Sequence, residues 1–286
     1  MRPVCSPSRT PRPRGVRPSR RSLSALWAIV LAACATAAPL PPEGSGGELL
    51  LLGEEHDAAE HHAIEARTVE RLADEGRLVA LALEMAERGR STAGLPRDAG
   101  EAEARAALAW NDAGWPWADY GPAVMAAVRR GVPAVGANLP RAAQAAAMRD
   151  ASLDAAVDGD WHARLREDVR EGHCGLLPES QLPGMTRVQI ARDRAMAATL
   201  VELAAGAGPG PVVLLVAGSA HVDATRGVPR HLAALAPTLR VRAVHLAAGA
   251  AAGEPAPGFD ETWPTPAVQG RADPCEGLKR RLAPAS

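Results

Sequence analysis

The stretch Leu49-Leu50-Leu51-Leu52-Gly53-Glu54-Glu55-His56-Asp57 decides the fold of this 286-residue chain. Four leucines run directly into a glycine, which is typical of a buried strand that ends at the glycine. The acidic residues and the histidine then fall where the strand leaves the sheet. In α/β proteins this edge is where ligands bind. We therefore expect Glu54 and His56 to belong to a site.

Further apolar runs predict strands that alternate with helices along the rest of the chain. These runs cover residues 78–83, 132–137, 211–217 and 239–246. Continuous apolar strands that alternate with helices indicate a parallel sheet covered on both faces. The predicted fold class is therefore α/β, with a mostly parallel central sheet covered by helices and with a helical insertion or lid.

Composition divides the chain into a signal peptide, a flexible tether, an α/β domain with two helical insertions, and a C-terminal tail. These parts cover residues 1–33, 34–47, 48–247 (insertions at about 90–130 and 141–190) and 248–286. The first part has a basic start and an apolar run that is shorter than the roughly 20 residues of a membrane-spanning helix, which is typical of a signal peptide. The tether is rich in Pro, Gly and Ser.

The cysteines indicate an exported protein. Leu31-Ala32-Ala33-Cys34 is similar to the lipobox of bacterial lipoproteins, in which the cysteine is lipidated; the alternative is an ordinary signal peptide with a chance cysteine. A lipid anchor predicts the bacterial cell envelope, with the periplasmic face of the outer membrane favoured over the inner membrane. In an oxidising compartment Cys174 and Cys275 predict one disulfide that ties the tail back, and two free thiols are the alternative.

Charge and lysine content exclude several function classes. The full chain has a net charge of −1, and the signal segment contains arginines but no acids, so the mature chain is more acidic. An acidic domain argues against nucleic acid as a partner. The only lysine is Lys279, in the tail, which leaves no lysine for a Schiff base or a P-loop in the domain.

Polar side chains follow four of the predicted strands. They are Glu54 and His56, then Glu84, Asn138 and His221. Since the carboxyl ends of parallel strands share one edge, we expect these side chains to converge. The pattern Gly-x-x-His occurs twice, at His56 and at His221, and its glycine would let the chain turn off the strand.

This set of side chains is compatible with three kinds of chemistry. Glu54, His56, Glu84 and His221 could bind a divalent metal such as zinc, manganese or iron, or act as general acids and bases. They could also form a solvated polar network without chemistry. We expect His62, Asn138 and Arg192 to surround them. The cluster of Trp110, Trp115, Trp117 and Tyr120 is either lid packing or a flat apolar wall for a planar ligand.

Several motifs occur in order over residues 48–247. They are Gly53-Glu54-Glu55-His56-Asp57, Leu83-Glu84-Met85, Trp115-Pro116 with Tyr120-Gly121-Pro122, Asn138-Leu139-Pro140, His173-Cys174-Gly175, Gln189 with Arg192-Asp193, and Gly218-Ser219-Ala220-His221. Together they resemble the ChaN-like lipoproteins, the haem-binding uptake branch of the Tiki/TraB/erythromycin-esterase superfamily.

The resemblance implies two functions. The first is a membrane-anchored haem-binding protein of haem and iron uptake, with haem as the favoured cofactor, a homodimer around haem, and an outer-membrane haem or siderophore receptor as a partner. A tyrosine is the kind of iron ligand expected there, and Tyr120 is the only tyrosine of the chain. The second is a metal-dependent protease or esterase, which implies His56, His221, Glu54 and Glu84 as its active residues. Both functions stay open at this point.

Overall fold

The computed structural model describes residues 48–205, 207, 210–271 and 273–282. The predicted signal peptide, the tether and the lipidation site Cys34 lie outside these described residues. Among the described residues, no helix is both long enough and apolar enough to cross a membrane.

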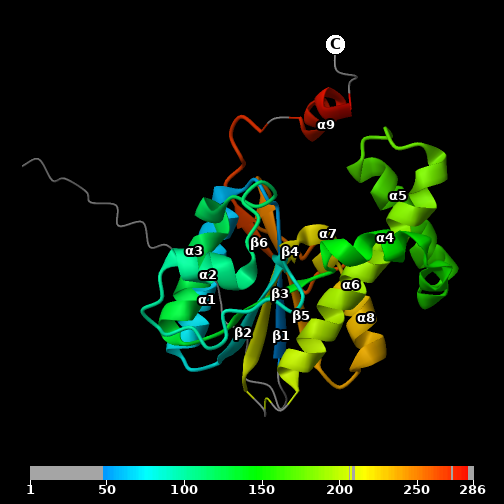
Figure 1. Ribbon diagram of the computed structural model, residues 1–286. Coiled ribbons are helices and arrows are strands. Elements are labelled where there is room, and N and C mark those ends of the chain that lie inside the picture. The colour runs from blue at the N-terminus through cyan, green and yellow to red at the C-terminus, as the bar shows by residue number, and fades with distance from the viewer. Residues whose placement is uncertain (1–47, 206, 208–209, 272, 283–286) are drawn as a thin grey trace, which may run out of the picture. The chain divides into compact units, whose positions relative to one another are not determined.

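A six-stranded sheet forms the centre of the domain, and all of its strand pairs are parallel (Figure 1). Its strands are β1 (Glu48–Glu54), β2 (Leu78–Glu87), β3 (Ala134–Asn138), β4 (Val212–Gly218), β5 (Arg240–Ala248) and β6 (Glu261–Thr265). Their order across the sheet is β3-β2-β4-β1-β5-β6. The predicted α/β class is confirmed.

The leucine run lies in the middle of this sheet, as β1. Leu49 to Leu52 are fully buried, because helices cover both faces and because β4 and β5 flank the strand on its two sides. Burial on both faces is why the strand is a continuous apolar run and does not alternate with polar residues.

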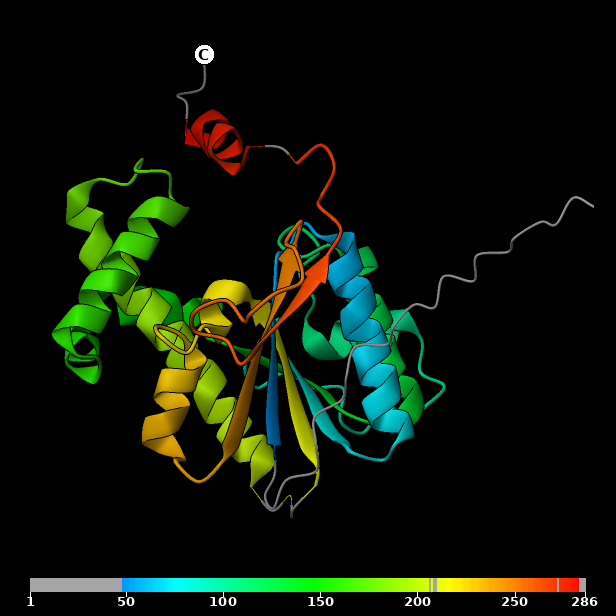
Figure 2. The same cartoon turned by 180° about the vertical axis from the view of Figure 1, so that it is seen from behind.

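Helices cover the two faces of the sheet (Figures 1 and 2). One face carries α1 (Ala59–Asp74), α2 (Glu101–Leu108) and α3 (Trp117–Arg130), and the other carries α6 (Leu182–Ala204) and α8 (Val228–Leu235). Two more helices, α4 (Arg141–Arg149) and α5 (Gly159–Gly172), pack on α6. The remaining elements are η1 (Ala151–Ala156), η2 (Glu179–Gln181), α7 (Ser219–Val222) and α9 (Pro274–Leu282).

The segment that we assigned to the tail contributes to the sheet. Residues 261–265 form β6, which pairs with β5 at the sheet edge. The Thr265 hydroxyl lies 2.8 Å from His61 Nε2 on α1. Farther along, Cys275 of α9 forms a disulfide with Cys174, as predicted. The tail is therefore fixed to the domain by pairing and by a covalent bond.

The chain connections move to opposite faces of the sheet at the ends of β1 and β4. The chain leaves β1 into α1, on one face, and leaves β4 into α7 and α8, on the other face. Adjacent strands whose connections diverge in this way form the usual ligand crevice of an open α/β sheet. Both Gly-x-x-His motifs start here, because Glu54 is in register with Gly218.

Candidate functional site

The first group of site residues surrounds the carboxylate of Glu54, at the end of β1. His56 Nδ1 lies 2.7 Å from one carboxylate oxygen, and the Tyr120 hydroxyl donates a hydrogen bond of 2.9 Å to that same oxygen. His62, from the first turn of α1, places Nε2 3.1 Å from the other oxygen. We call these four residues the Glu54 cluster.

Glu54 is ionised although it is buried. Burial by itself raises the pKa of its carboxyl, but the contacts with His56 and His62 outweigh burial and hold the pKa at about 2. The pKa of Tyr120 is raised, first by burial and then by the charge of Glu54. Tyr120 is therefore a neutral hydrogen-bond donor in this arrangement.

The second group surrounds the carboxylate of Glu84, on β2. One of its oxygens accepts the backbone N–H of Gly218 at 2.8 Å, and the other pairs with Arg192 and lies 3.4 Å from His221 Nε2. On the far side of the ring, His221 Nδ1 pairs with the buried carboxylate of Asp193. We call Glu84, Arg192, His221 and Asp193 the Glu84 cluster.

His221 is cationic because it lies between two carboxylates. Burial lowers its pKa, but the charges of Glu84 and Asp193 outweigh this and raise the pKa to about 9. Burial raises the pKa of Glu84, yet His221 and Arg192 bring it well below the ordinary value. Asn138 supports the cluster, since its amide oxygen accepts from Arg192 at 3.0 Å and its amide nitrogen donates to the Glu84 carbonyl at 2.9 Å.

Gly218 joins the two clusters. A Cβ at this position would lie 2.9 Å from His56 Nε2 and 3.6 Å from Glu84 Oε2. A Cβ at Gly53 would lie 3.0 Å from Ser219 Cα. We expected these glycines to permit a sharp turn, but Gly218 has φ −57° and ψ 144°, which any residue can adopt. A side chain is excluded there because neighbouring groups already occupy the space that it would need.

The aromatic cluster is mostly internal packing. Tyr120 and Trp117 are buried, whereas Trp115 is partly exposed. The Trp115 ring meets the His56 ring edge to face, with centroids 4.8 Å apart. Trp115 also borders a cavity of about 350 Å³ whose wall includes Glu84, Asn138 and Arg192. One member of the cluster thus forms an apolar wall beside the site.

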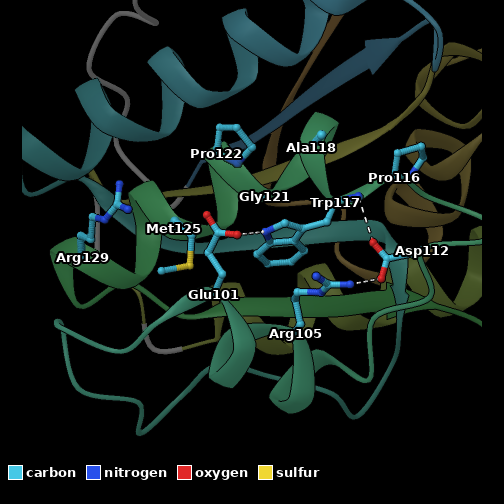
Figure 3. Close-up of a pocket in the computed structure, with 10 residues that line it drawn as sticks. All are labelled: Glu101, Arg105, Asp112, Pro116, Trp117, Ala118, Gly121, Pro122, Met125 and Arg129. Carbon is cyan, nitrogen blue, oxygen red and sulfur yellow. Dashed lines mark hydrogen bonds and ion pairs between the residues drawn. The ribbon is translucent and has the colours of Figure 1, made fainter.

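A larger cavity of about 730 Å³ lies apart from the strand ends, between α2 and α3 (Figure 3). Its central side chain is Trp117, whose indole N–H donates to Glu101 at 2.9 Å. Arg105 pairs with Asp112 on the same wall. Of the residues that we predicted to form the site or its aromatic wall, Trp117 alone lines this cavity.

The comparisons with known proteins agree with this fold. The profile of the family described as haem-binding uptake, Tiki superfamily, ChaN matches residues 43–232. The chain belongs to this family. A solved structure of ChaN from Campylobacter jejuni, described as showing cofacial heme binding, is 25% identical with a TM-score of 0.57, over 71% of this chain and 83% of that chain.

Two further comparisons add no functional argument. The type III effector HopBA1 is 14% identical with a TM-score of 0.48, over 77% of this chain and 88% of that chain. No curated protein matches the chain.

The predicted metal site is not supported in this ChaN-family chain. In the described part of the chain, no group of three or more His, Cys, Asp or Glu side chains is arranged to bind a metal ion. The four predicted ligands fall into two clusters whose carboxylates are already paired, Glu54 with His56 and Glu84 with Arg192. A metal would have to displace these partners. The two clusters are instead arranged as histidine–carboxylate pairs.

His56 is the member of the Glu54 cluster that is most open to solvent. The His56 side chain is 43% exposed, whereas that of Glu54 is fully buried. Tyr120 is only 1% exposed, and its hydroxyl is held by Glu54. Tyr120 stays a predicted haem ligand, and ligation would require its hydroxyl to leave Glu54 and become accessible.

The structure also shows residues that the sequence analysis did not assign to the site, although two of them, Gln189 and Asp193, belong to its motifs. Asp193 orients His221, and the Gln189 amide lies 3.1 Å from the same ring nitrogen. Glu65 of α1 is fully buried, and its oxygens have no hydrogen-bond partner among the described residues. Its pKa is raised well above the ordinary value, first by burial and then by the Glu54 charge. The sequence did contain a signal for Glu65, because residues three positions apart on a helix share a face, and Glu65 follows His62 by three positions.

Proposed function

We propose that this chain binds haem at the carboxyl edge of its sheet and serves haem uptake. Membership of the haem-binding uptake family supports the proposal, as does the likeness to a ChaN described as binding haem cofacially. The observation that carries it is the exposed His56 ring beside Trp115, at the carboxyl edge of the sheet. There a nitrogen ligand lies next to an aromatic wall suited to a planar macrocycle.

Titration of the purified chain with ferric haem tests this proposal. We expect a saturable Soret change with an endpoint set by the chain concentration. Quenching of tryptophan fluorescence should follow the same curve, because Trp115 borders the site. A linear absorbance increase, equal to that of haem added to buffer, would overturn the proposal.

We further propose that the protein is lipid-anchored through Cys34 in the bacterial cell envelope, with the outer membrane favoured. The lipobox-like Leu31-Ala32-Ala33-Cys34 supports this anchor. Metabolic labelling with a radioactive fatty acid should mark the wild type but not a Cys34→Ala variant. Equal labelling of both would contradict the anchor. A haem or siderophore receptor in the same membrane is the partner that this location suggests.

A homodimer is the remaining part of this proposal. The ChaN structure from C. jejuni is described as showing cofacial heme binding, and two haem faces can be stacked when two protein copies each contribute one. Light scattering after size exclusion should show a monomer that doubles in mass when haem is added. An unchanged mass with bound haem would contradict dimerisation while leaving haem binding intact.

A second candidate function is hydrolysis without a metal. It is favoured by two histidine–carboxylate pairs, His56 with Glu54 and His221 with Asp193, on either side of Gly218. In such a site His56 would take a proton from water as the water attacks an ester or amide carbonyl, and the proton would pass to the leaving group. Turnover of an ester and peptide panel in the presence of a chelator, lost in His56→Ala, tests this function.

A further inference from the structure

The segment after β6 contacts the loop that carries His56. This loop, residues 55–57, follows β1, and we call it the site loop. We call residues 266–271 the strap. We propose that the strap holds the site loop through Arg271, and that Arg271 is thereby a positioning residue for the site at the strand ends. This role applies whichever of the two functions proposed above the site performs.

Arg271 binds the acidic side chains on both sides of His56. Its Nε and Nη2 donate to the two carboxylate oxygens of Asp57, each at 2.7 Å, and Nη2 also lies 2.6 Å from Glu55 Oε2. The planar guanidinium of arginine suits this arrangement, because it can donate to both oxygens of a carboxylate at once. His56 instead contacts Glu54, with Nδ1 2.7 Å away. One arginine thus holds the residues before and after the histidine.

Two more contacts of the site loop lead to the last part of the chain. The other carboxylate oxygen of Glu55 accepts the backbone N–H of Ala248, at the end of β5, at 3.0 Å. The Glu55 N–H donates to His61 Nδ1 at 3.0 Å, and Nε2 of that ring lies 2.8 Å from the Thr265 hydroxyl of β6. The site loop is therefore bound by β5, by β6 through His61, and by the strap through Arg271.

The strap is fixed on both sides of Arg271. Near its start it packs on the end of β5, where a Cβ at Gly249 would lie 3.1 Å from the Cβ of Ala267. Gly270, directly before Arg271, has φ +65°, a conformation that L side chains rarely adopt. Beyond Arg271, the disulfide of α9 fixes the chain again. A shaped segment, rather than a free end, therefore presents Arg271 to the site loop.

The contacts of Arg271 restrict the site loop more than they stabilise the fold. The side chains of Arg271 and Asp57 are 40% and 54% exposed, and ion pairs this exposed add little to stability. Without Arg271, Asp57 loses its ion pair and the loop is held only on the Glu55 side. We then expect His56 to turn away from Glu54 part of the time, while the domain stays folded.

Nitrogen NMR of the full chain labelled with ¹⁵N-histidine tests this role without any ligand, and His56→Gln assigns the signals. In the wild type, neutral His56 should carry its proton on Nδ1, because the ionised Glu54 carboxylate only accepts hydrogen bonds. In Arg271→Gln we expect the two nitrogen shifts of His56 to move towards the averaged values of a free imidazole. Exchange of the Glu55 amide hydrogen should accelerate about threefold or more.

Three variants serve as controls. Arg130→Gln removes another bidentate pair, with Asp74 at 2.7 and 3.1 Å, between α3 and the far end of α1, and should change neither measurement. Asp57→Asn should reproduce the effect of Arg271→Gln, and the double variant should add nothing to it. Circular dichroism checks the folding of every variant.

Wild-type nitrogen shifts of His56 together with wild-type exchange of Glu55 in Arg271→Gln would overturn the positioning role. The same changes in Arg130→Gln would also overturn it, because they would follow from the loss of any surface ion pair. Effects of Arg271→Gln and Asp57→Asn that add in full would show that the two side chains act separately, against a strap. Altered shifts and faster exchange in these two variants alone, without addition, support the role.

Discussion

At the scale of single residues, Gly218 determines how closely the two clusters can approach each other. It lies between the two clusters and contacts both, and the atoms around it leave no room for a methyl group. A side chain there would not strain the backbone but would push His56 away from the strand end. The glycine is therefore a requirement of the site rather than of the fold.

Gly218→Ala tests this role. The new Cβ would lie 2.9 Å from His56 Nε2, so we expect a loss of about 1–3 kcal/mol of unfolding free energy and weaker haem binding. Gly159→Ala on α5 is the control, because a Cβ there meets no atom within 4 Å. Urea unfolding and haem titration measure both effects. Equal behaviour of the two variants would contradict the role of Gly218.

The protonation of His221 predicts how stability changes with pH. Its folded pKa of about 9 is above the ordinary 6.5, so its contribution is complete below pH 6.5 and is lost as the pH rises through 9. We expect the wild type to lose roughly 3 kcal/mol over this window relative to His221→Gln. Urea unfolding at several pH values gives the slope of unfolding free energy against pH for both proteins. Parallel slopes would mean that His221 is neutral in the folded protein.

At the scale of elements, α1 presents one face to the site and the opposite face to solvent. His62 reaches Glu54 from its first turn, and Glu65 is buried one turn later. On the opposite side Glu60 is exposed and pairs with Arg67. The helix therefore offers two glutamates in contrasting environments.

Glu65→Gln should stabilise the protein at neutral pH. Glu65 has a raised pKa and is protonated in the folded chain, whereas in the unfolded chain it ionises above about pH 4.5, so stability declines as the pH rises from there. The amide removes this cost, and we expect a gain in unfolding free energy at pH 7 that shrinks as the pH falls and vanishes near pH 4. Glu60→Gln is the control. A gain at pH 4 as well would show that ionisation is not the cause.

At the scale of the whole molecule, the disulfide joins distant parts of the chain. Cys174 follows α5 and Cys275 lies in α9, with a sequence separation of 101. Between them lie α6, β4, β5 and β6, so the bond closes a loop that contains half of the sheet. A crosslink over a long loop restricts the unfolded chain most.

Reduction should therefore lower the stability of the wild type by roughly 2–5 kcal/mol. The control is Cys174→Ser/Cys275→Ser, which should start at the lower stability and should not respond to reductant. Thermal unfolding with and without dithiothreitol measures the difference. A wild type that is unaffected by reduction would show that the disulfide adds nothing to the fold.

Local sequence signals were sufficient for much of the fold. Leu49 to Leu52 identified the central strand because burial on both faces requires continuous apolar residues. β6 was missed, since Glu261–Thr265 is a short edge strand that contains a proline and has no apolar run. The positions of Glu54, Glu84, Asn138 and His221 at one edge followed from the parallel order of the strands, which the apolar pattern already indicated.

The sequence by itself determined the α/β class, the strand ends that form the site and the pairing of Cys174 with Cys275, because these depend on local pattern and residue type. Only the tertiary structure decided which side chains share a partner. It placed Tyr120 inside, left His56 exposed and added Asp193 and Glu65. The physical reason is that burial and hydrogen bonding arise between residues far apart in the chain, as between Tyr120 and Glu54. The spacing of residues along the sequence indicates neither their burial nor their hydrogen-bond partners.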